Sequence, residues 1–188
     1  TQNLQNALWI QGRLNPDLIA KSASDIAKAA GLERPEISKL KVLMVEETGT
    51  GSEHPFSGEK LCPVLTVYRA ASFEDACRQI EKIYDFQGKG HSVGLHSQDE
   101  SRPLKMGMNL PACRVIVNQA HCFATGGSFD NGLPFSLSMG CGTWGGNSIS
   151  ENLNYRHYLN IVRIVSPIPP VEPSIEEIFG EYWSRYGR

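Results

Sequence analysis

The sequence predicts an α/β fold with a mostly parallel sheet flanked by helices. Four short apolar runs have the length and β-branched content of buried strands: residues 41–45, 64–68, 91–96 and 115–117. Helical patterns lie between some of these runs, at residues 72–84 and 102–109. Strands that alternate with helices are typical of βαβ units, in which consecutive strands run parallel.

The helical patterns between the strands have defined starts and apolar faces. Ser72 is a favoured N-cap residue, and Asp75 three positions later strengthens the signal. Residues 102–109 form a shorter pattern, in which Pro103 fits only the first turn. In the longer helix the apolar side chains recur at helical spacing: Phe73, Ala76, Cys77, Ile80, Ile83 and Tyr84.

Both ends of the chain add elements outside this alternation. Asn15 followed by Pro16 predicts a helix start and Gly31 a helix end, with a break near residues 22–24 that would split the helix. Towards the other end, residues 155–165 predict a final strand. A proline-rich linker and an amphipathic helix capped by Ser174 are then expected over residues 167–173 and 174–186.

Two segments lack periodicity. Residues 46–60 are polar and contain glycine, which predicts a loop. Residues 119–150 are rich in glycine, and long aperiodic segments inside compact domains are commonly functional or disordered. We expect an ordered segment that lines a pocket, because it contains several large aromatic side chains: Phe123, Phe129, Phe135 and Trp144.

Length and composition exclude several classes of protein. A chain of 188 residues suits one domain, and its net charge of −2 gives no broad attraction to nucleic acid or to an anionic membrane. No apolar run approaches the roughly 20 residues of a membrane-spanning helix. Five cysteines without CxxC spacing predict neither a disulfide framework nor a zinc site, so we expect reduced thiols in the cytoplasm. Because the sequence begins with Thr1 rather than with an initiator Met, and has no signal-peptide pattern, we expect a processed or cut product.

Gly140, Gly142 and Gly145 have the spacing of a dinucleotide-binding fingerprint in a context that does not suit one. Such a fingerprint follows an apolar strand, opens a helix and precedes an acidic residue by about 20 positions. Residues 134–138 and 147–150 supply neither the strand nor the helix. The glycines would still let backbone N–H groups approach an anion, and a tight structural turn is the alternative.

Glu59 is a candidate nucleotide-binding residue, since it directly precedes a predicted strand. One carboxylate can accept hydrogen bonds from two ribose hydroxyls, which suits an acid at the end of a strand. The alternative is a solvated glutamate. We expect its neighbour Lys60 to be an exposed charge rather than a base.

His121 and Cys122 are adjacent, and this does not favour a catalytic dyad, because such pairs normally meet through space. We expect His121 to line a pocket and donate to an anionic substrate group, or else to bond the backbone of its loop. His91 and His96 fall on opposite faces of a strand, so no shared metal site is predicted. Three cysteines are expected to be small core residues: Cys62, Cys77 and Cys113.

Motifs in a fixed order across residues 15–165 resemble those of the CoA-acylating aldehyde dehydrogenases. Within that family, residues 119–123 also resemble acylating sulfoacetaldehyde dehydrogenases, whose sulfonate is an anion that His121 and glycine-loop N–H groups could receive. The family motifs are Pro55-Phe56, Glu59-Lys60-Leu61-Cys62-Pro63, Gly88-Lys89-Gly90-His91-Ser92, Arg114-Val115-Ile116-Val117-Asn118, residues 140–148 and His157-Tyr158-Leu159-Asn160.

The resemblance implies an aldehyde-dehydrogenase-like fold in three parts. Residues 1–153 would form most of a catalytic domain, residues 154–166 an oligomerisation-arm strand that pairs across a homo-oligomer, and residues 167–188 a linker and C-terminal helix. The family uses NAD or NADP with CoA as co-substrate, and Glu59 matches the residue that holds the nicotinamide-side ribose. The matching residues of the aldehyde pocket are Asn118, His121, Cys122, Phe123 and Phe135.

The catalytic cysteine of the family has no counterpart among the five cysteines, and its main dinucleotide-binding segment is also missing from this sequence. In the complete enzyme a thiolate would attack the aldehyde, the nicotinamide would accept hydride and CoA would take the acyl group. We therefore expect the C-terminal part of an enzyme, inactive alone and without a catalytic residue of its own. Two alternatives are a non-catalytic binding module derived from this fold and a hydrolytic aldehyde dehydrogenase that releases a free acid.

Overall fold

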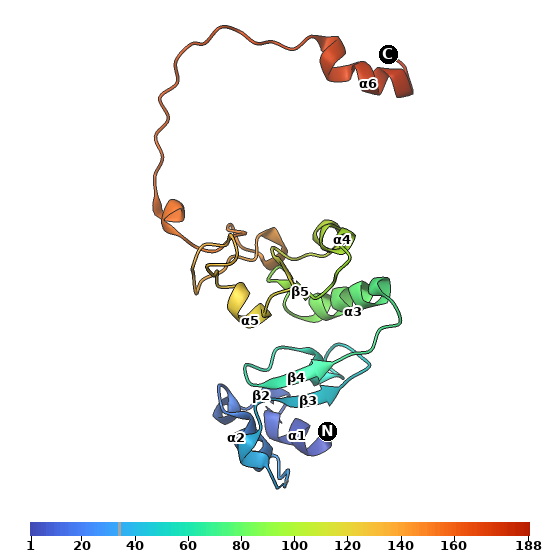
Figure 1. The fold of residues 1–188 in the computed structure, drawn as a ribbon, viewed down its shortest axis with the longest axis vertical. Helices are drawn as coiled ribbons and strands as arrows, with labels where there is room; N and C mark the ends of the chain where they lie inside the picture. The colour runs from blue at the N-terminus through green and yellow to red at the C-terminus, as the bar shows by residue number, and fades with distance from the viewer. Residues whose placement is uncertain (34) are drawn as a thin grey trace. The chain divides into compact units, whose positions relative to one another are not determined.

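The computed structural model describes residues 1–33 and 35–188 (Figure 1). The chain forms two compact units, Thr1–His157 and Tyr158–Arg188. The first unit contains every strand that the described residues form, together with most of their helices. Its helices alternate with short parallel strands, so the predicted α/β class is confirmed.

The first unit opens with a helix and a hairpin that the sequence does not predict. Helix α1 (Gln2–Leu8) buries Leu4 and Leu8, which lie one turn apart, and leads into the antiparallel strands β1 (Trp9–Ile10) and β2 (Arg13–Leu14). The helix spans seven residues and has no side-chain cap, and each strand is two residues long. Elements this short have little local sequence signal of their own.

The predicted break in the following helix is confirmed. Asn15 accepts a hydrogen bond from the Asp17 amide at 3.1 Å and caps a 3₁₀ turn, η1 (Pro16–Leu18). Ser22 then accepts from the Asp25 amide at 3.2 Å and caps α2 (Ala23–Ala29). A second 3₁₀ turn, η2 (Ile37–Lys39), follows.

The next two predicted strands form one parallel pair. Strand β3 (Leu43–Glu46) pairs with β4 (Val64–Val67), with Leu43 opposite Val64. The connection contains a 3₁₀ turn, η3 (Pro55–Ser57), whose Phe56 is 1% exposed and packs edge-on against Trp9. The core of this region joins α1, α2, β3 and β4: Leu4, Leu8, Leu18, Ile26, Ala30, Val45, Phe56 and Val64.

A second parallel pair follows with its own helices. Helix α3 (Phe73–Phe86) starts at the predicted cap, where Ser72 accepts from the Asp75 amide at 3.0 Å. Strand β5 (Val93–Leu95), helix α4 (Ser101–Asn109) and strand β6 (Val115–Val117) form a βαβ unit in which Val93 lies opposite Val115. Figure 1 shows α3 and α4 beside β5, and their core is centred on Val93, Met106 and Leu110.

The predicted parallel pairing is therefore confirmed, as two separate two-stranded sheets rather than one larger sheet. The aperiodic segment after β6 contains a single short helix, α5 (His121–Ala124), and the 3₁₀ turn η4 (Thr143–Gly145). Gly140, Gly142 and Gly145 thus belong to a turn that neither follows a strand nor opens an α-helix, as the sequence context indicates.

The strand predicted over residues 155–165 is not formed in this chain. Residues Tyr155–Tyr158 form a 3₁₀ turn, η5, and the next residues are extended without pairing. Strands need a partner for their backbone groups, and a single chain supplies none here. In the second unit, helix α6 (Ile175–Tyr186) begins with the predicted Ser174 cap, completed by Glu177 into a capping box. Among the described residues no helix has both the length and the apolar character needed to cross a bilayer.

Candidate functional site

Glu59 lies at the edge of a cleft. The loop between η3 and β4 presents its carboxylate to solvent, and the Glu59 amide donates to Oε1 of Gln87 at 2.8 Å. Gln87 follows the end of α3, so this contact joins two distant segments of the first unit. The cleft has a volume of about 630 Å³ and is lined by polar and aromatic side chains that include Gln5, Asn6, Trp9, Ser52, Glu59, Phe86 and Gln87. A volume of this size is in the usual range for small-molecule sites.

Lys60 is not the exposed charge that the sequence predicts. Its side chain is half-buried, and Nζ donates to the carbonyl oxygens of Phe56 at 2.7 Å and Gly58 at 2.8 Å, and to Oγ1 of Thr66 at 3.0 Å. These three bonds use every donor of an ammonium group, and burial lowers the pKa of Lys60. Sequence position alone does not show this burial, through which Lys60 holds the backbone just before Glu59.

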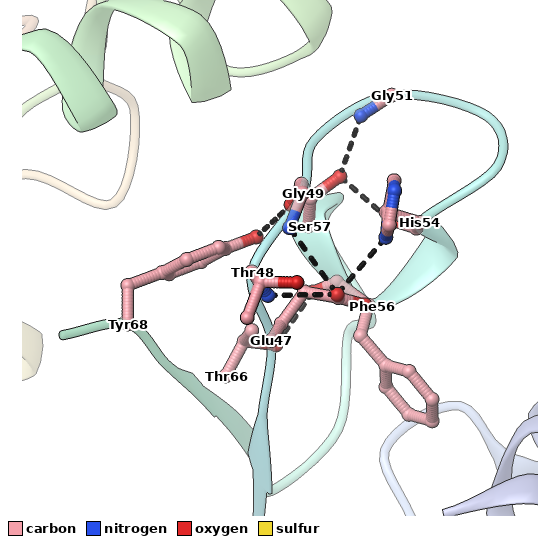
Figure 2. Close-up of polar contacts among 9 residues, drawn as sticks. All are labelled: Glu47, Thr48, Gly49, Gly51, His54, Phe56, Ser57, Thr66 and Tyr68. Carbon is pink, nitrogen blue, oxygen red and sulfur yellow. Dashed lines mark hydrogen bonds and ion pairs between the residues drawn. The ribbon is translucent and has the colours of Figure 1, made fainter.

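The loop between β3 and η3 is closed by a cluster of polar contacts (Figure 2). Oε1 of Glu47 accepts from the amides of Thr48 at 2.8 Å and Gly49 at 3.3 Å, and lies 2.9 Å from Nδ1 of His54. Burial alone would raise the pKa of Glu47, but the two amides and His54 outweigh it, so the pKa lies below its ordinary value. The Glu47 carboxylate therefore joins the start of the loop to His54 near its end.

Two more side chains complete this closure in Figure 2. Ser57 accepts from the Gly51 amide at 3.0 Å and donates to the carbonyl of His54 at 2.7 Å, while the Tyr68 hydroxyl donates to the carbonyl of Gly49 at 2.8 Å. The loop leads directly into the segment that carries Glu59. The hydrogen bonds within the loop indicate that its backbone has a fixed position where it leads towards the cleft.

Asn118 joins the loops that follow β5 and β6. Its Oδ1 accepts from the Ser97 amide and its Nδ2 donates to the Ser97 carbonyl, both at 2.9 Å. The Asn118 backbone has φ = 53°, in the left-handed region that asparagine tolerates better than most residues. Both loops therefore leave the carboxyl ends of their parallel strands in a fixed relation, at the edge where ligands commonly bind in α/β folds.

His121, the first residue of α5, lies beside the start of β5. Its Nε2 is 2.8 Å from Oγ of Ser92, and the same oxygen is 2.6 Å from Nδ1 of His91. His121 is half-buried, and burial, with a smaller effect of His91, lowers its pKa. The sequence alone indicates neither a functional part for Ser92 nor its position between the two histidines. The available signal is that His91 and Ser92 belong to one family motif and His121 to another.

Buried Arg114 holds the segment that carries His91. Its Nη1 donates to the carbonyls of His91 at 3.2 Å and Gly140 at 2.9 Å, and its Nε donates to Oδ1 of Asn152 at 2.8 Å. Asn152 is fully buried and donates in turn to the carbonyls of Thr125 and Pro134, each at 2.9 Å. The sequence does not reveal this network, which joins the aperiodic segment to Arg114 at the start of β6.

The glycine loop packs directly against the residue before His91. Gly90 has φ = 92°, and a Cβ built on it would lie only 2.4 Å from the Cys141 carbonyl oxygen. Only glycine fits a backbone this close. The contact brings the motif of residues 88–92 against the motif of residues 140–148.

The other predicted pocket residues are not gathered around His121. Cys122 is exposed, Phe123 is 77% exposed, and Phe135 packs edge-on against Phe129 with ring centroids 5.0 Å apart. Their place in an aldehyde pocket stays a prediction. Burial raises the pKa values of Cys62, Cys77 and Cys113, and none of these three thiols has the exposed, electropositive setting of a nucleophile.

The sequence of the chain is similar to those of curated enzymes. Over 185 residues the chain is 54% identical to a sulfoacetaldehyde dehydrogenase (acylating) of Cupriavidus necator, covering 98% of the chain and 38% of that protein. It is 38% identical to a succinate-semialdehyde dehydrogenase (acetylating) of Clostridium kluyveri, covering 95% of the chain and 39% of that protein. No protein-family profile matches the chain.

Solved structures give the same result for the fold. An acetylating aldehyde dehydrogenase from Geobacillus thermoglucosidasius superposes with a TM-score of 0.82 at 34% identity, over 92% of this chain and 38% of that one. A probable aldehyde dehydrogenase from Listeria monocytogenes gives 0.81 at 33% identity, over 94% and 38%. The chain thus spans well under half the length of the proteins it matches. By sequence and by fold, it corresponds to a segment of the acylating aldehyde dehydrogenases.

Proposed function

We propose that this chain is the C-terminal part of an NAD(P)-dependent, CoA-acylating aldehyde dehydrogenase. The reaction converts an aldehyde, CoA and NAD(P)⁺ into an acyl-CoA and NAD(P)H. The 54% identity to an acylating sulfoacetaldehyde dehydrogenase over 98% of the chain is the observation that supports this most strongly. It exceeds the 38% identity to the succinate-semialdehyde enzyme, which favours sulfoacetaldehyde as the substrate.

Glu59 suits the ribose-binding part of this activity. Its carboxylate is exposed at a cleft of about 630 Å³, and Lys60 fixes the backbone beside it. A carboxylate that accepts from both hydroxyls of one ribose would orient a nicotinamide dinucleotide, which supplies the hydride acceptor when bound. Trp9 and Phe86 add flat apolar surface in the same cleft.

Asn118 and His121 suit the aldehyde side. Asn118 fixes the loops at the carboxyl ends of β5 and β6, and His121 lies where α5 returns to β5. Because burial lowers its pKa, His121 is neutral at rest and can donate a hydrogen bond to a sulfonate oxygen without a desolvated charge. The attacking thiolate and the remaining dinucleotide contacts would come from residues outside this chain.

Initial rates of NAD(P)⁺ reduction by the intact protein that carries this chain test the proposal. We expect reduction with sulfoacetaldehyde that depends on CoA, and slower turnover with uncharged aldehydes of similar size. Equal rates with and without CoA would instead support the hydrolytic alternative. An intact protein that binds neither NAD(P)⁺ nor CoA in calorimetric titrations would support a non-catalytic module.

A further inference from the structure

One serine hydroxyl lies between two imidazole rings from different segments. Oγ of Ser92 is 2.6 Å from Nδ1 of His91 and 2.8 Å from Nε2 of His121, a residue 29 positions away in the sequence. Among the described residues, no third polar group bonds this hydroxyl. A serine hydroxyl donates one proton and accepts through its lone pairs. It is fully used when it donates to one ring nitrogen and accepts from the other.

The backbone around Ser92 is held from three sides. The Tyr84 hydroxyl, from α3, donates to the Ser92 carbonyl at 2.6 Å, and burial raises the pKa of Tyr84 to about 12, so it stays a donor at neutral pH. Arg114 Nη1 donates to the His91 carbonyl at 3.2 Å, and the Val93 amide donates to the Arg114 carbonyl at 2.9 Å. Ser92 therefore has little freedom to move away from either ring.

The two rings differ in their surroundings. His91 is exposed, whereas His121 is half-buried and packs on β5, where a Cβ added to Gly94 would lie 2.8 Å from its Nδ1. Burial, and to a smaller extent His91, lowers the pKa of His121. The exposed ring is the one that can exchange protons with solvent or a ligand, and the half-buried ring is neutral at rest.

We propose that Ser92 is a positioning residue that locks His91 and His121 into linked tautomers, so that a proton can pass between the rings through its hydroxyl. When Nε2 of His91 takes up a proton, its Nδ1 proton passes to Oγ of Ser92. The original hydroxyl proton passes to Nε2 of His121, which becomes the cation, and Ser92 ends neutral. The part that this proton transfer plays in catalysis rests on the proposed function, in which His121 lies on the aldehyde side.

The linkage makes a sharp prediction about tautomers. The rings face Ser92 with different nitrogens, Nδ1 of His91 and Nε2 of His121. If the hydroxyl donates to one and accepts from the other, both rings must carry their proton on the same type of nitrogen. Rings that both donate to Ser92 would instead have opposite tautomers.

Two-bond proton–nitrogen couplings in the ¹⁵N-histidine-labelled 188-residue chain measure these tautomers directly. We expect matching tautomers of His91 and His121 in the wild type and in Ser92→Thr, which keeps the hydroxyl. In Ser92→Ala, at least one ring should change to a mixed population, while His54 keeps its wild-type signals as an internal reference. Ser136→Ala removes a half-buried hydroxyl of the same unit that contacts neither ring and should change nothing.

Opposite tautomers in the wild type, or unchanged tautomers in a folded Ser92→Ala, would overturn the proposal. A Ser92→Ala chain that does not fold leaves the wild-type and Ser92→Thr tautomers to decide it. The NMR test uses no cofactor or aldehyde, so loss of the proposed enzymatic function would not be mistaken for failure of the linkage. In the active intact protein, Ser92→Ala should lower kcat by about 100-fold, leave KM for NAD(P)⁺ unchanged and shift the pH–rate profile, with recovery in Ser92→Thr.

Discussion

Nε of Arg114 donates to Oδ1 of Asn152 across 2.8 Å, and both side chains are buried. Asn152 also donates to the carbonyls of Thr125 and Pro134, so one side chain joins Arg114, directly before β6, to two points of the aperiodic segment. This pair explains how residues without periodic structure keep a defined arrangement beside His91.

Asn152→Ala is expected to lower the free energy of unfolding by about 3 kcal/mol, because it leaves the buried Arg114 guanidinium and the Thr125 carbonyl with unmet hydrogen bonds and removes the part-buried bond to the Pro134 carbonyl. Urea unfolding followed by circular dichroism measures the change. Asn109→Ala is a matched control, since that exposed amide bonds only a carbonyl of its own helix and should alter stability by less than about 0.5 kcal/mol. Equal effects of the two substitutions would contradict the role of the buried pair.

Lys60→Met is expected to raise KM for NAD(P)⁺ roughly tenfold in the intact enzyme, with little change in kcat. Methionine keeps the apolar stem but removes the donors to Phe56, Gly58 and Thr66, which frees the backbone that presents Glu59. Steady-state kinetics at saturating CoA separate the two parameters. Lys39→Met, at a side chain that is 73% exposed, should leave both unchanged. A fall in kcat alone would show that Lys60 acts elsewhere.

Glu59→Gln keeps the size of the side chain and removes its charge, which weakens acceptance from two ribose hydroxyls at once. We expect KM for NAD(P)⁺ to rise by about tenfold or more while KM for CoA stays the same. Glu172→Gln, in the exposed extended segment, is the control. If Glu59→Gln left cofactor kinetics at wild-type values, the carboxylate would have to be a solvated glutamate.

Glu47 makes stability depend on pH. Its pKa is lower in the folded state than its ordinary value of 4.5. Its contribution to the free energy of unfolding is therefore fully present above pH 4.5 and is lost as the pH falls through the folded pKa. Urea unfolding of wild type and Glu47→Gln at about pH 7 and about pH 4 tests this, with the larger difference between the proteins expected at the higher pH. A difference that grew on acidification would have the wrong sign.

The sequence predicts those parts of the fold whose causes are local. Ser72 and Ser174 each cap the helix that follows them, and the caps need only neighbouring amides. The strand predicted over residues 155–165 is not formed in the single chain, because strand formation depends on a partner that local composition cannot supply, and its pairing across subunits stays a prediction.

The site was predicted only in part for the same reason. Glu59, Asn118 and His121 were recognised through motifs, whereas the burial of Lys60 and the contact of His121 with Ser92 depend on how distant segments meet. Arg114 illustrates the limit most clearly, since a charged residue beside an apolar strand gives no sign that it will be 5% exposed and bonded to Asn152.

Mass spectrometry of the product made by the intact protein from sulfoacetaldehyde, CoA and NAD(P)⁺ tests the central claim most directly. We predict the CoA thioester of sulfoacetate, formed in equal amounts with NAD(P)H. Free sulfoacetate as the primary product, at the same rate with or without CoA, would contradict it.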